Sequence, residues 1–434
     1  MPSITRLFAD ISPLRESPPF RRLWAGSTLS SVGSSMTRFA VMLQVYDLTK
    51  SSFAVGLISL AQLVPILLIG LLGGSLADAV DRRKLVLICN CGATATAAGL
   101  AVQAFAGSRQ LWLLYLLVMI QASVASVSAP ARQTFIPRLL PASKLPAGLA
   151  LNRLSFQIML VVGPALAGLI TATPGLGLRG CYLVDALSFA CGFYGVIRLP
   201  PMPPTTGPAG GAPTRPGPRA VAAGVRYIGR TPVLAGAFLA DLTATVFGLP
   251  VALFPAINAE RFGGDPRTLG LFTAAIGVGG LVSAVLSGPL RHLRRQGLTM
   301  LIAVAIWGAA FAGFAVAASL WLTLTMLALA GAADTFTVVL RGTIVQTTTP
   351  EEFRGRVTAA DFVVGSGGGS LGNLEAGALG SLTTPTISAL SGGLATVVVS
   401  LLIGLALPAF TRYRFKPKDP DPQIAPDELA STPS

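Results

Sequence analysis

The chain has 434 residues, of which 52% are hydrophobic and only 12% are charged, and its mean hydropathy is +0.68. Since a soluble protein carries about twice that share of charged residues, the composition excludes a soluble enzyme or a soluble binding domain. The net charge of +14 would by itself fit a nucleic acid partner, so the placement of the charges has to decide that point.

Twelve apolar segments of about 20 residues follow one another along the chain, and each is long enough to cross a membrane as a helix. We therefore expect an all-α integral membrane protein with twelve transmembrane helices in two six-helix halves. The predicted spans are 22–46, 54–76, 85–107, 111–135, 148–172, 179–198, 232–257, 268–290, 298–317, 321–345, 358–382 and 386–410.

The segments outside the two bundles are rich in charge, proline or glycine. Residues 1–21 lack an isolated apolar core, so we expect a cytoplasmic N-terminal segment rather than a signal peptide. Residues 199–231 begin with a stretch rich in Pro and Gly, which predicts a disordered linker, and end in a predicted amphipathic helix on the membrane surface. A cytoplasmic tail, also expected to be disordered, occupies 411–434. The predicted bundles are therefore 22–198 and 232–410.

Lysine and arginine gather on one side of the predicted membrane. With the N-terminus inside, 26 of the 32 fall on inner loops, tails or inner helix ends, and Arg38 lies within a span. Five lie outside: Lys50, Arg109, Arg179, Arg261 and Arg267. This bias predicts a multi-pass protein of the bacterial inner membrane with both termini in the cytoplasm. The basic composition then needs no nucleic acid, and the lipid bilayer is the expected partner.

The second half of the sequence repeats the first at an offset of 209 residues. Leu111-Trp112-Leu113 recurs as Leu320-Trp321-Leu322, Arg132 as Arg341, and the polar Asn152 falls on Asp361. Gly163 and Gly168 recur as Gly372 and Gly377. Duplicated membrane bundles are how many transporters build a central site between two halves that can rock against each other.

The loop between the second and third spans, GGSLADAVDRRK, carries Gly74, Asp78, Asp81, Arg82 and Arg83. With two sets of six spans, this pattern resembles the inner-loop motif of the major facilitator superfamily, and the resemblance covers nearly the whole chain. Asp81 replaces the usual glycine, a variant typical of the branch of drug and siderophore exporters that includes bacterial enterobactin exporters. The resemblance implies a latch from this loop to residues 357–361; alternatively, the basic residues only hold the loop inside.

Two further motifs resemble that branch. Span five contains Gly163, Pro164 and Gly168, similar to the antiporter motif of proton-driven exporters, where Gly-Pro bends a helix and glycine permits close packing. A P-x-x-x-R-G-R element follows span ten from Pro350 to Arg356. The basic residues that we single out on the inner loops are Arg132, Arg341, Arg354 and Arg356.

Five ionisable residues lie inside predicted spans, where charge is costly and commonly functional. They are Arg38, Asp185, Asp241, Asp334 and Glu375. A carboxylic acid away from water favours its protonated form and can release the proton when the site opens, which is what a proton-coupled antiporter requires. The alternative is an interhelical hydrogen bond or a buried ion pair that fixes packing.

The sequence contains no motif for nucleotide hydrolysis, and no Gly-Lys dipeptide occurs in it. Four cysteines lie in apolar segments without polar partners, so we expect no metal site and no disulfide. The chain is therefore expected to be no enzyme, to need no cofactor and to use an ion gradient.

The favoured hypothesis is a monomeric, proton-coupled exporter that moves a small organic molecule out of the bacterial cytoplasm by alternating access. The resemblance makes a siderophore of the enterobactin type the specific substrate, and Arg38 and the inner arginines are expected to attract an anionic catecholate. A multidrug or macrolide-type efflux pump of the same superfamily is the second hypothesis. A membrane sensor or enzyme that does not transport is the third.

Overall fold

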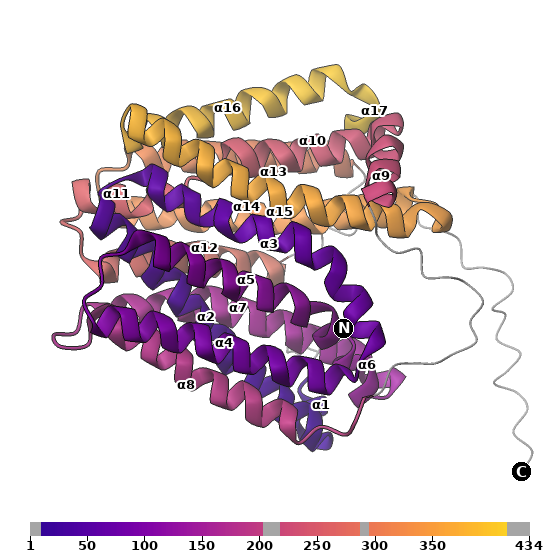
Figure 1. Cartoon of the computed structure of the whole chain (residues 1–434). Helices are drawn as coiled ribbons and strands as arrows, with labels where there is room; N and C mark the ends of the chain where they lie inside the picture. The colour runs from indigo at the N-terminus through magenta and orange to yellow at the C-terminus, as the bar shows by residue number, and fades with distance from the viewer. Residues whose placement is uncertain (1–9, 203–217, 287–294, 415–434) are drawn as a thin grey trace, which may run out of the picture.

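The computed structural model describes residues 10–202, 218–286 and 295–414, with the backbone alone for residues 70–79, 218–220 and 286. These residues form helices and short connections, and no strand occurs among them. The long helices run side by side in one bundle, with α11 at one end and α9 across the other (Figure 1). The predicted disorder of the linker and the tail concerns mainly 203–217 and 415–434, which lie outside the described residues.

The part before the linker contains six long helices and three short ones. They are α1 (Ser12–Glu16), α2 (Pro18–Thr49), α3 (Ser52–Ala79), α4 (Arg82–Phe105), α5 (Leu111–Gln133), α6 (Phe135–Leu139), the 3₁₀ turn η2 (Ala142–Lys144), α7 (Leu145–Thr171) and α8 (Gly177–Ile197). Side-chain caps and proline set several helix starts, as at α2, where Ser17 accepts a hydrogen bond from the Phe20 N–H and proline occupies the first turn.

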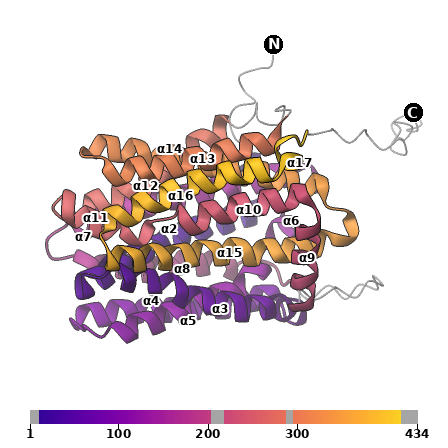
Figure 2. The ribbon, with the colours of Figure 1, turned by 90° about the horizontal axis from the view of Figure 1, so that it is seen from above.

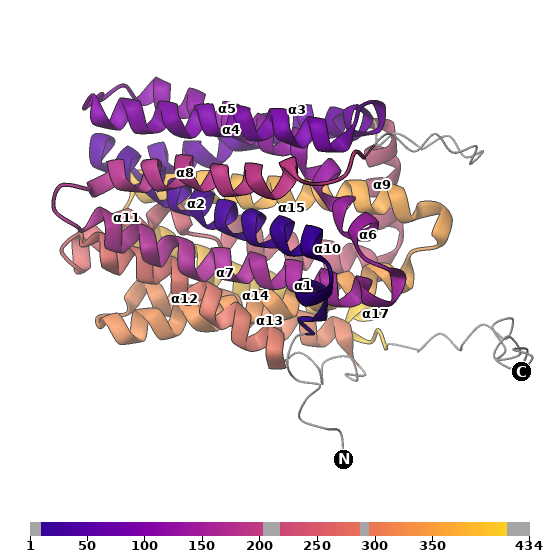
Figure 3. The same ribbon diagram turned by 90° about the horizontal axis from the view of Figure 1, so that it is seen from below.

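The part after the linker begins with the predicted amphipathic helix. Its elements are α9 (Pro218–Arg230), α10 (Pro232–Phe247), η3 (Val251–Leu253), α11 (Phe254–Arg261), α12 (Pro266–Leu286), α13 (Gln296–Val316), α14 (Leu320–Thr348), α15 (Glu351–Leu382), α16 (Pro385–Ala406) and α17 (Pro408–Thr411). Views from above and from below place α3, α4 and α5 along one flank of the bundle and α12, α13 and α14 along the opposite flank (Figures 2 and 3).

Ten of the described helical segments are long and apolar enough to cross a membrane. The predicted spans 22–46 and 358–382 are absent from these ten and fall on α2 and α15, which have 32 residues each. Both helices are long enough to cross but carry serine, glycine and charged residues along their length. A polar helix is stable in a bilayer only where other helices or water cover it, so α2 and α15 are the helices best suited to line an interior path.

The predicted span 232–257 is a broken helix in the structure. α10 ends at Phe247, and Gly248 to Pro250 separate it from η3 and α11. Side chains of other helices satisfy backbone groups that the break leaves without helical partners. The Gly248 carbonyl accepts a hydrogen bond from the Trp307 indole at 2.7 Å, and the Ala252 N–H donates to the Asn373 side chain at 3.1 Å. Trp307 is therefore a buried packing residue that stabilises the break.

The repeat in sequence is also a repeat in packing. Leu111 and Leu320, which are 209 residues apart, are the first residues of α5 and α14. Gly163 on α7 lies against Ser35 of α2, and its counterpart Gly372 on α15 lies against the backbone of α10 at Thr245. α2 and α10 are each the first long helix of their part, so repeat-related glycines make repeat-related contacts.

The parts before and after the linker meet along two pairs of helices, α7 with α12 and α3 with α15. Gly168 on α7 approaches Pro266 and Gly270 of α12, and its counterpart Gly377 on α15 approaches Ser52 and Phe53 of α3. The Phe53 N–H also donates to the Ser381 hydroxyl at 2.9 Å. These contacts hold the two parts together toward the end of the bundle where α11 lies.

Adding a methyl group at Gly377 should separate α3 from α15, because its Cβ would stand 2.5 Å from the Ser52 carbonyl oxygen. We expect Gly377→Ala to destabilise the detergent-solubilised protein by ~1–3 kcal/mol, seen as a lower apparent unfolding temperature. Gly365→Ala on the same helix is the matched control, since no described residue has an atom within 4 Å of its Cβ position. Equal unfolding temperatures for the two variants would contradict the close approach.

Candidate functional site: an arginine shared by two carboxylates

Arg341 on α14 stands between two acids that come from different helices. Its Nη1 lies 3.3 Å from Oδ2 of Asp241 on α10 and also donates to Oδ1 of Asp361 on α15. The exposed fraction of the side chain rises from 7% for Asp241 through 15% for Arg341 to 35% for Asp361. Solvent therefore reaches the cluster from the side of Asp361.

Small residues on α15 bring these helices together. The Cβ positions of Gly368 and Gly372 would lie 2.5 and 2.1 Å from the hydroxyl and carbonyl oxygens of Thr245 on α10. The Thr245 hydroxyl in turn donates to the Asp241 carbonyl at 2.9 Å. Close approach of α10 and α15 places Asp241 and Asp361 within reach of one guanidinium from α14.

A third acid, Asp334, lies two helical turns before Arg341 on α14 and is part-buried. It is within electrostatic reach of Asp241 and Arg341, and of Arg153 on α7. Three carboxylates and one shared arginine thus occupy adjoining parts of α10, α14 and α15, a surplus of acid inside a bundle of apolar helices. We call Asp241, Asp334, Arg341 and Asp361 the acidic cluster.

The part before the linker carries two exposed cations, of which Arg153 is within electrostatic reach of Asp334. Arg153 on α7 is exposed, and its guanidinium lies 5.4 Å from the centre of the Phe156 ring. Arg38 on α2 is exposed as well, and its Nη2 lies 3.3 Å from the Met159 sulfur of α7. Of the predicted residues, the structure therefore brings Asp241 and Arg341 into contact and places Asp334 close to them.

Asp185 is not part of the acidic cluster. Its side chain on α8 is completely buried and accepts hydrogen bonds from Thr37 at 2.6 Å and from Ser34 at 3.4 Å, both on α2. Ser188 on its own helix lies within 3.5 Å. No cation lies within 4.0 Å of it among the described residues, although Arg38 interacts with it electrostatically. These contacts fit the packing interpretation, in which Asp185 ties α8 to α2.

Glu375 also stands apart. It is part-buried on α15, 14 residues beyond Asp361, which is about 21 Å along a helix. It has neither a hydrogen bond nor an ion pair within the part of the chain that the structure describes. Its surroundings give no sign of a shared site with the acidic cluster.

The predicted latch loop is fixed locally. Asp81 caps α4 by accepting from the Arg83 and Lys84 N–H groups, and it accepts from the Met202 N–H at 3.4 Å. Arg82 is buried, and the Arg83 guanidinium donates to the Ile197 carbonyl. Gly74 and Asp78 belong to α3, but their side chains lie outside the described ones. Asp81 is thus occupied by local contacts, and Asp361 is paired with Arg341. A latch between this loop and residues 357–361 stays a prediction, and Asp78 is the acid left to make it.

The other basic residues of the inner loops have local contacts. Arg132, the repeat counterpart of Arg341, donates to the Asn90 side chain of α4. Arg354 forms an exposed ion pair with Glu351 at 3.6 Å, and the Arg356 guanidinium lies 5.2 Å from the centre of the Phe353 ring. In the antiporter-like motif, Pro164 lies inside α7, between the two glycines that approach α2 and α12.

Asp361 is the member of the cluster that the sequence analysis did not select. The repeat aligns it with Asn152, so an acid had replaced a neutral residue at a duplicated position. That substitution was the available signal. The sequence indicated Asp361 only as part of the predicted latch contact at 357–361, at the start of a span.

Replacing Arg341 should leave two carboxylates facing each other without a cation. We expect Arg341→Gln to lower the stability of the solubilised protein by ~3 kcal/mol at pH 8, and the loss to shrink at pH 5 because protonation removes the repulsion. Adding Asp241→Asn and Asp361→Asn to the same chain should restore stability at pH 8. Unfolding curves at the two pH values measure this, and a loss independent of pH would contradict the shared pairing.

Comparisons with known proteins agree on the class of protein. The enterobactin exporter EntS of Citrobacter koseri is 29% identical over 414 residues, which cover 95% of this chain and 97% of the relative. EntS of Shigella boydii is 28% identical over 410 residues, with 94% and 96% covered.

Solved structures share the fold at low identity. The nucleoside transporter NupG superposes with a TM-score of 0.71 at 15% identity, covering 91% of this chain and 99% of that one. A bacterial homologue of the lysosomal transporter Spinster, crystallised in an inward-facing and unoccupied conformation, gives 0.70 at 14% identity, with 92% and 99% covered. These superpositions show a shared fold; with relatives that are exporters over nearly their full length, they agree with the predicted membrane transporter.

A family model described as transmembrane secretion effector matches residues 8–430. Because this match spans almost the whole chain, the protein belongs to the transmembrane secretion effector family of the major facilitator superfamily.

Proposed function

We propose that this protein exports a siderophore of the enterobactin type across the bacterial inner membrane by proton antiport with alternating access. The observation that carries the proposal is the acidic cluster, in which Arg341 is shared by Asp241 and Asp361 with Asp334 nearby. The names of the two relatives support the substrate, since both are enterobactin exporters over nearly their full length.

The proposed topology is twelve spans in two six-helix halves, with both termini in the cytoplasm and a single chain as the working unit. α2 and α15 complete the count, since each is long enough to cross and each is covered by other helices. The repeat-related contacts of Gly163 and Gly372 support two equivalent halves. The positive-inside bias supports the orientation.

The charge of the cluster favours binding of a proton. If Asp241, Asp334 and Asp361 were all ionised, Arg341 would balance one of three negative charges, and Arg153 is the next cation within electrostatic reach. Uncompensated charge is costly away from water, and carboxylic acids avoid the cost by taking up protons. The cluster therefore offers a site for a proton, and its affinity for that proton depends on the charges and hydrogen-bond donors around the carboxylates.

Antiport requires that binding of the substrate releases protons, and this requirement restricts how the substrate binds. An anion bound to Arg341 would draw the guanidinium away from Asp241 and Asp361, so the carboxylates would take up protons, which is the wrong sign. Hydrogen-bond donors have the right sign, because they stabilise an ionised carboxylate. We therefore propose that the hydroxyl groups of an iron-free catechol donate to Asp334 and Asp361, in place of the expected attraction of a catecholate anion to the arginines.

Alternating access is supported by where the halves touch. The glycine contacts of α7 with α12 and of α3 with α15 lie toward the end with α11. At the opposite end α9 crosses α15, where Tyr227 stacks on Phe353 at 4.4 Å and Gly224 contacts Ala360, next to Asp361. Opening of one end and closure of the other would change the exposure of Asp361, the most exposed of the three residues in the ion pairs.

The same sign argument favours one alternative substrate. A cationic amine, as found in many macrolide and multidrug substrates, would also stabilise ionised carboxylates and release protons. The surplus of acid in the cluster is the observation that supports export of a cationic drug as the second candidate function.

Transport by inside-out vesicles tests the coupling. We expect Asp334→Asn and Asp361→Asn to reduce accumulation driven by an imposed pH gradient to background, because a neutral amide cannot exchange a proton. Exchange of labelled for unlabelled substrate without a gradient should continue. Glu352→Gln, an exposed acid at the start of α15, is the matched control and should accumulate substrate like the unaltered protein. Full accumulation by both asparagine variants would refute proton coupling at this cluster.

A deletion strain tests the substrate. Under iron starvation we expect the strain to lose most of the siderophore from its medium and to regain secretion when the gene is returned, but not with the Asp334→Asn variant. Chromatography of the medium and drug-sensitivity assays measure both hypotheses side by side. Unchanged siderophore secretion with new sensitivity to cationic drugs would favour the alternative.

A further inference from the structure

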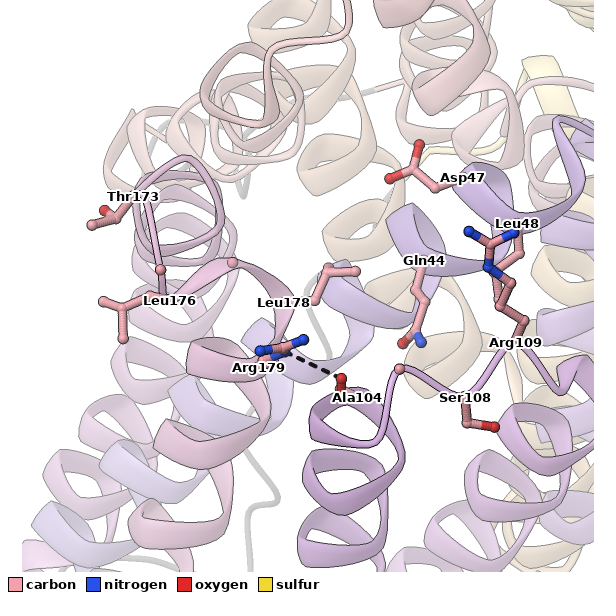
Figure 4. A pocket seen from close by; sticks show the side chains of 13 residues that line it. Gln44, Asp47, Leu48, Ala104, Ser108, Arg109, Thr173, Leu176, Leu178 and Arg179 are labelled. Carbon is pink, nitrogen blue, oxygen red and sulfur yellow. Dashed lines mark hydrogen bonds between the residues drawn. The ribbon is translucent and has the colours of Figure 1, made fainter.

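A second polar site lies at the end of the bundle near α11, within the part of the chain before the linker. A pocket of about 530 Å³ opens between the last turn of α2, the turn after α4 and the connection from α7 to α8. All of the described residues that line it lie between 44 and 179, so it is separate from the acidic cluster on α10, α14 and α15. Figure 4 shows Arg109 and Arg179 on opposite sides of Gln44.

The charge of this pocket is positive. Its acid, Asp47, is already paired with Lys50 at 3.0 Å. Arg109 has neither a hydrogen bond nor an ion pair, and Arg179 has no carboxylate within 4.0 Å, in each case among the described residues. Two guanidinium groups therefore face one concave surface without an anion to balance them.

One wall and the base of the pocket are held by hydrogen bonds within the protein. Arg179 donates through Nε to the Ala104 carbonyl at 3.2 Å and lies 5.5 Å from the centre of the Phe105 ring, which leaves its Nη groups as donors. Beneath the pocket, buried Gln44 exchanges hydrogen bonds with Gln103 at 3.1 and 3.3 Å and accepts one from Tyr182 at 2.6 Å. The Arg179 side of the pocket is thus ordered in advance and loses little freedom on binding.

We propose that this pocket binds a phosphate group carried by an organic molecule. A guanidinium group can donate two parallel hydrogen bonds to phosphate oxygens. The volume of the pocket exceeds what a bare phosphate needs, which leaves room for an attached organic group. The pocket has an apolar border, where Phe105 and Leu176 are 55% and 47% exposed, as suits a lipid headgroup at the membrane surface. A water-soluble organic phosphate offers the same chemistry.

Native mass spectrometry of the full-length protein in detergent compares phosphatidylglycerol with diacylglycerol, which has the same chains without the phosphate. Thermal-shift titration compares glycerol 3-phosphate with glycerol. We expect a preference for the phosphate member of at least one pair, and we expect the Arg109→Gln, Arg179→Gln double variant to bind it about tenfold or more weakly. Arg267→Gln, an exposed arginine at the start of α12 and outside the pocket, should bind normally.

Preference for phosphatidylglycerol alone would assign a lipid site, and binding of glycerol 3-phosphate as well would assign a soluble ligand. If the double variant fails to fold, because Arg179 also holds the Ala104 carbonyl, Arg109→Gln alone carries the test, since Arg109 makes no hydrogen bond to any residue that the structure describes. No preference in either pair, or unchanged binding by the folded arginine variants, would overturn the proposal.

Discussion

One guanidinium held between two carboxylates is the interaction on which the account of this transporter depends. Arg341 joins α10, α14 and α15 through Asp241 and Asp361, so the ion pairs are at once structural and chemical. A buried ion pair adds little stability by itself, but removing one partner leaves a charge that the surroundings cannot tolerate. Any proton or substrate that changes the charge of one carboxylate therefore changes how three helices hold together.

Glycine packing makes this arrangement possible and also shapes the way it can move. Gly368 and Gly372 let α15 approach α10 near the cluster, while Gly377, farther along the same helix, contacts α3 of the other part of the chain. One helix thus connects the acidic cluster with the contact between the two proposed halves. If a change of charge in the cluster shifts α15, the contact of Gly377 with α3 shifts as well. Such a connection between the site and the contact of the two halves is what alternating access needs.

Much of the fold could be predicted from the sequence because hydropathy and duplication act over many residues. Ten of the predicted spans and the amphipathic helix before α10 follow from such patterns, whereas the superfamily was indicated by the resemblance of the inner-loop motif. The members of the site were harder to predict, because they depend on the rotation of each helix about its axis. Asp185 and Asp241 are equivalent as acids in apolar spans, yet one is bound by hydroxyl groups of α2 and the other by Arg341.

Two other features were beyond the reach of hydropathy. The break between α10 and α11 depends on distant partners, Trp307 and Asn373, which satisfy its backbone. Asp361 lies near a predicted helix start, where a charged residue is common, and only the packing of α14 against α15 shows that Arg341 pairs with it. In both cases a local sequence pattern was compatible with several structures, and contacts between helices far apart in the sequence selected one.

In the proposed mechanism, substrate binding drives protons off the acidic cluster. The most direct measurement is a pH-indicator titration of the purified protein in weakly buffered detergent at pH 7, during addition of an iron-free catechol siderophore. The account predicts release of about one proton per bound molecule, and loss of that release, with binding retained, when Asp334 and Asp361 are both replaced by asparagine. Binding with no change in pH, or with uptake of protons, would contradict it.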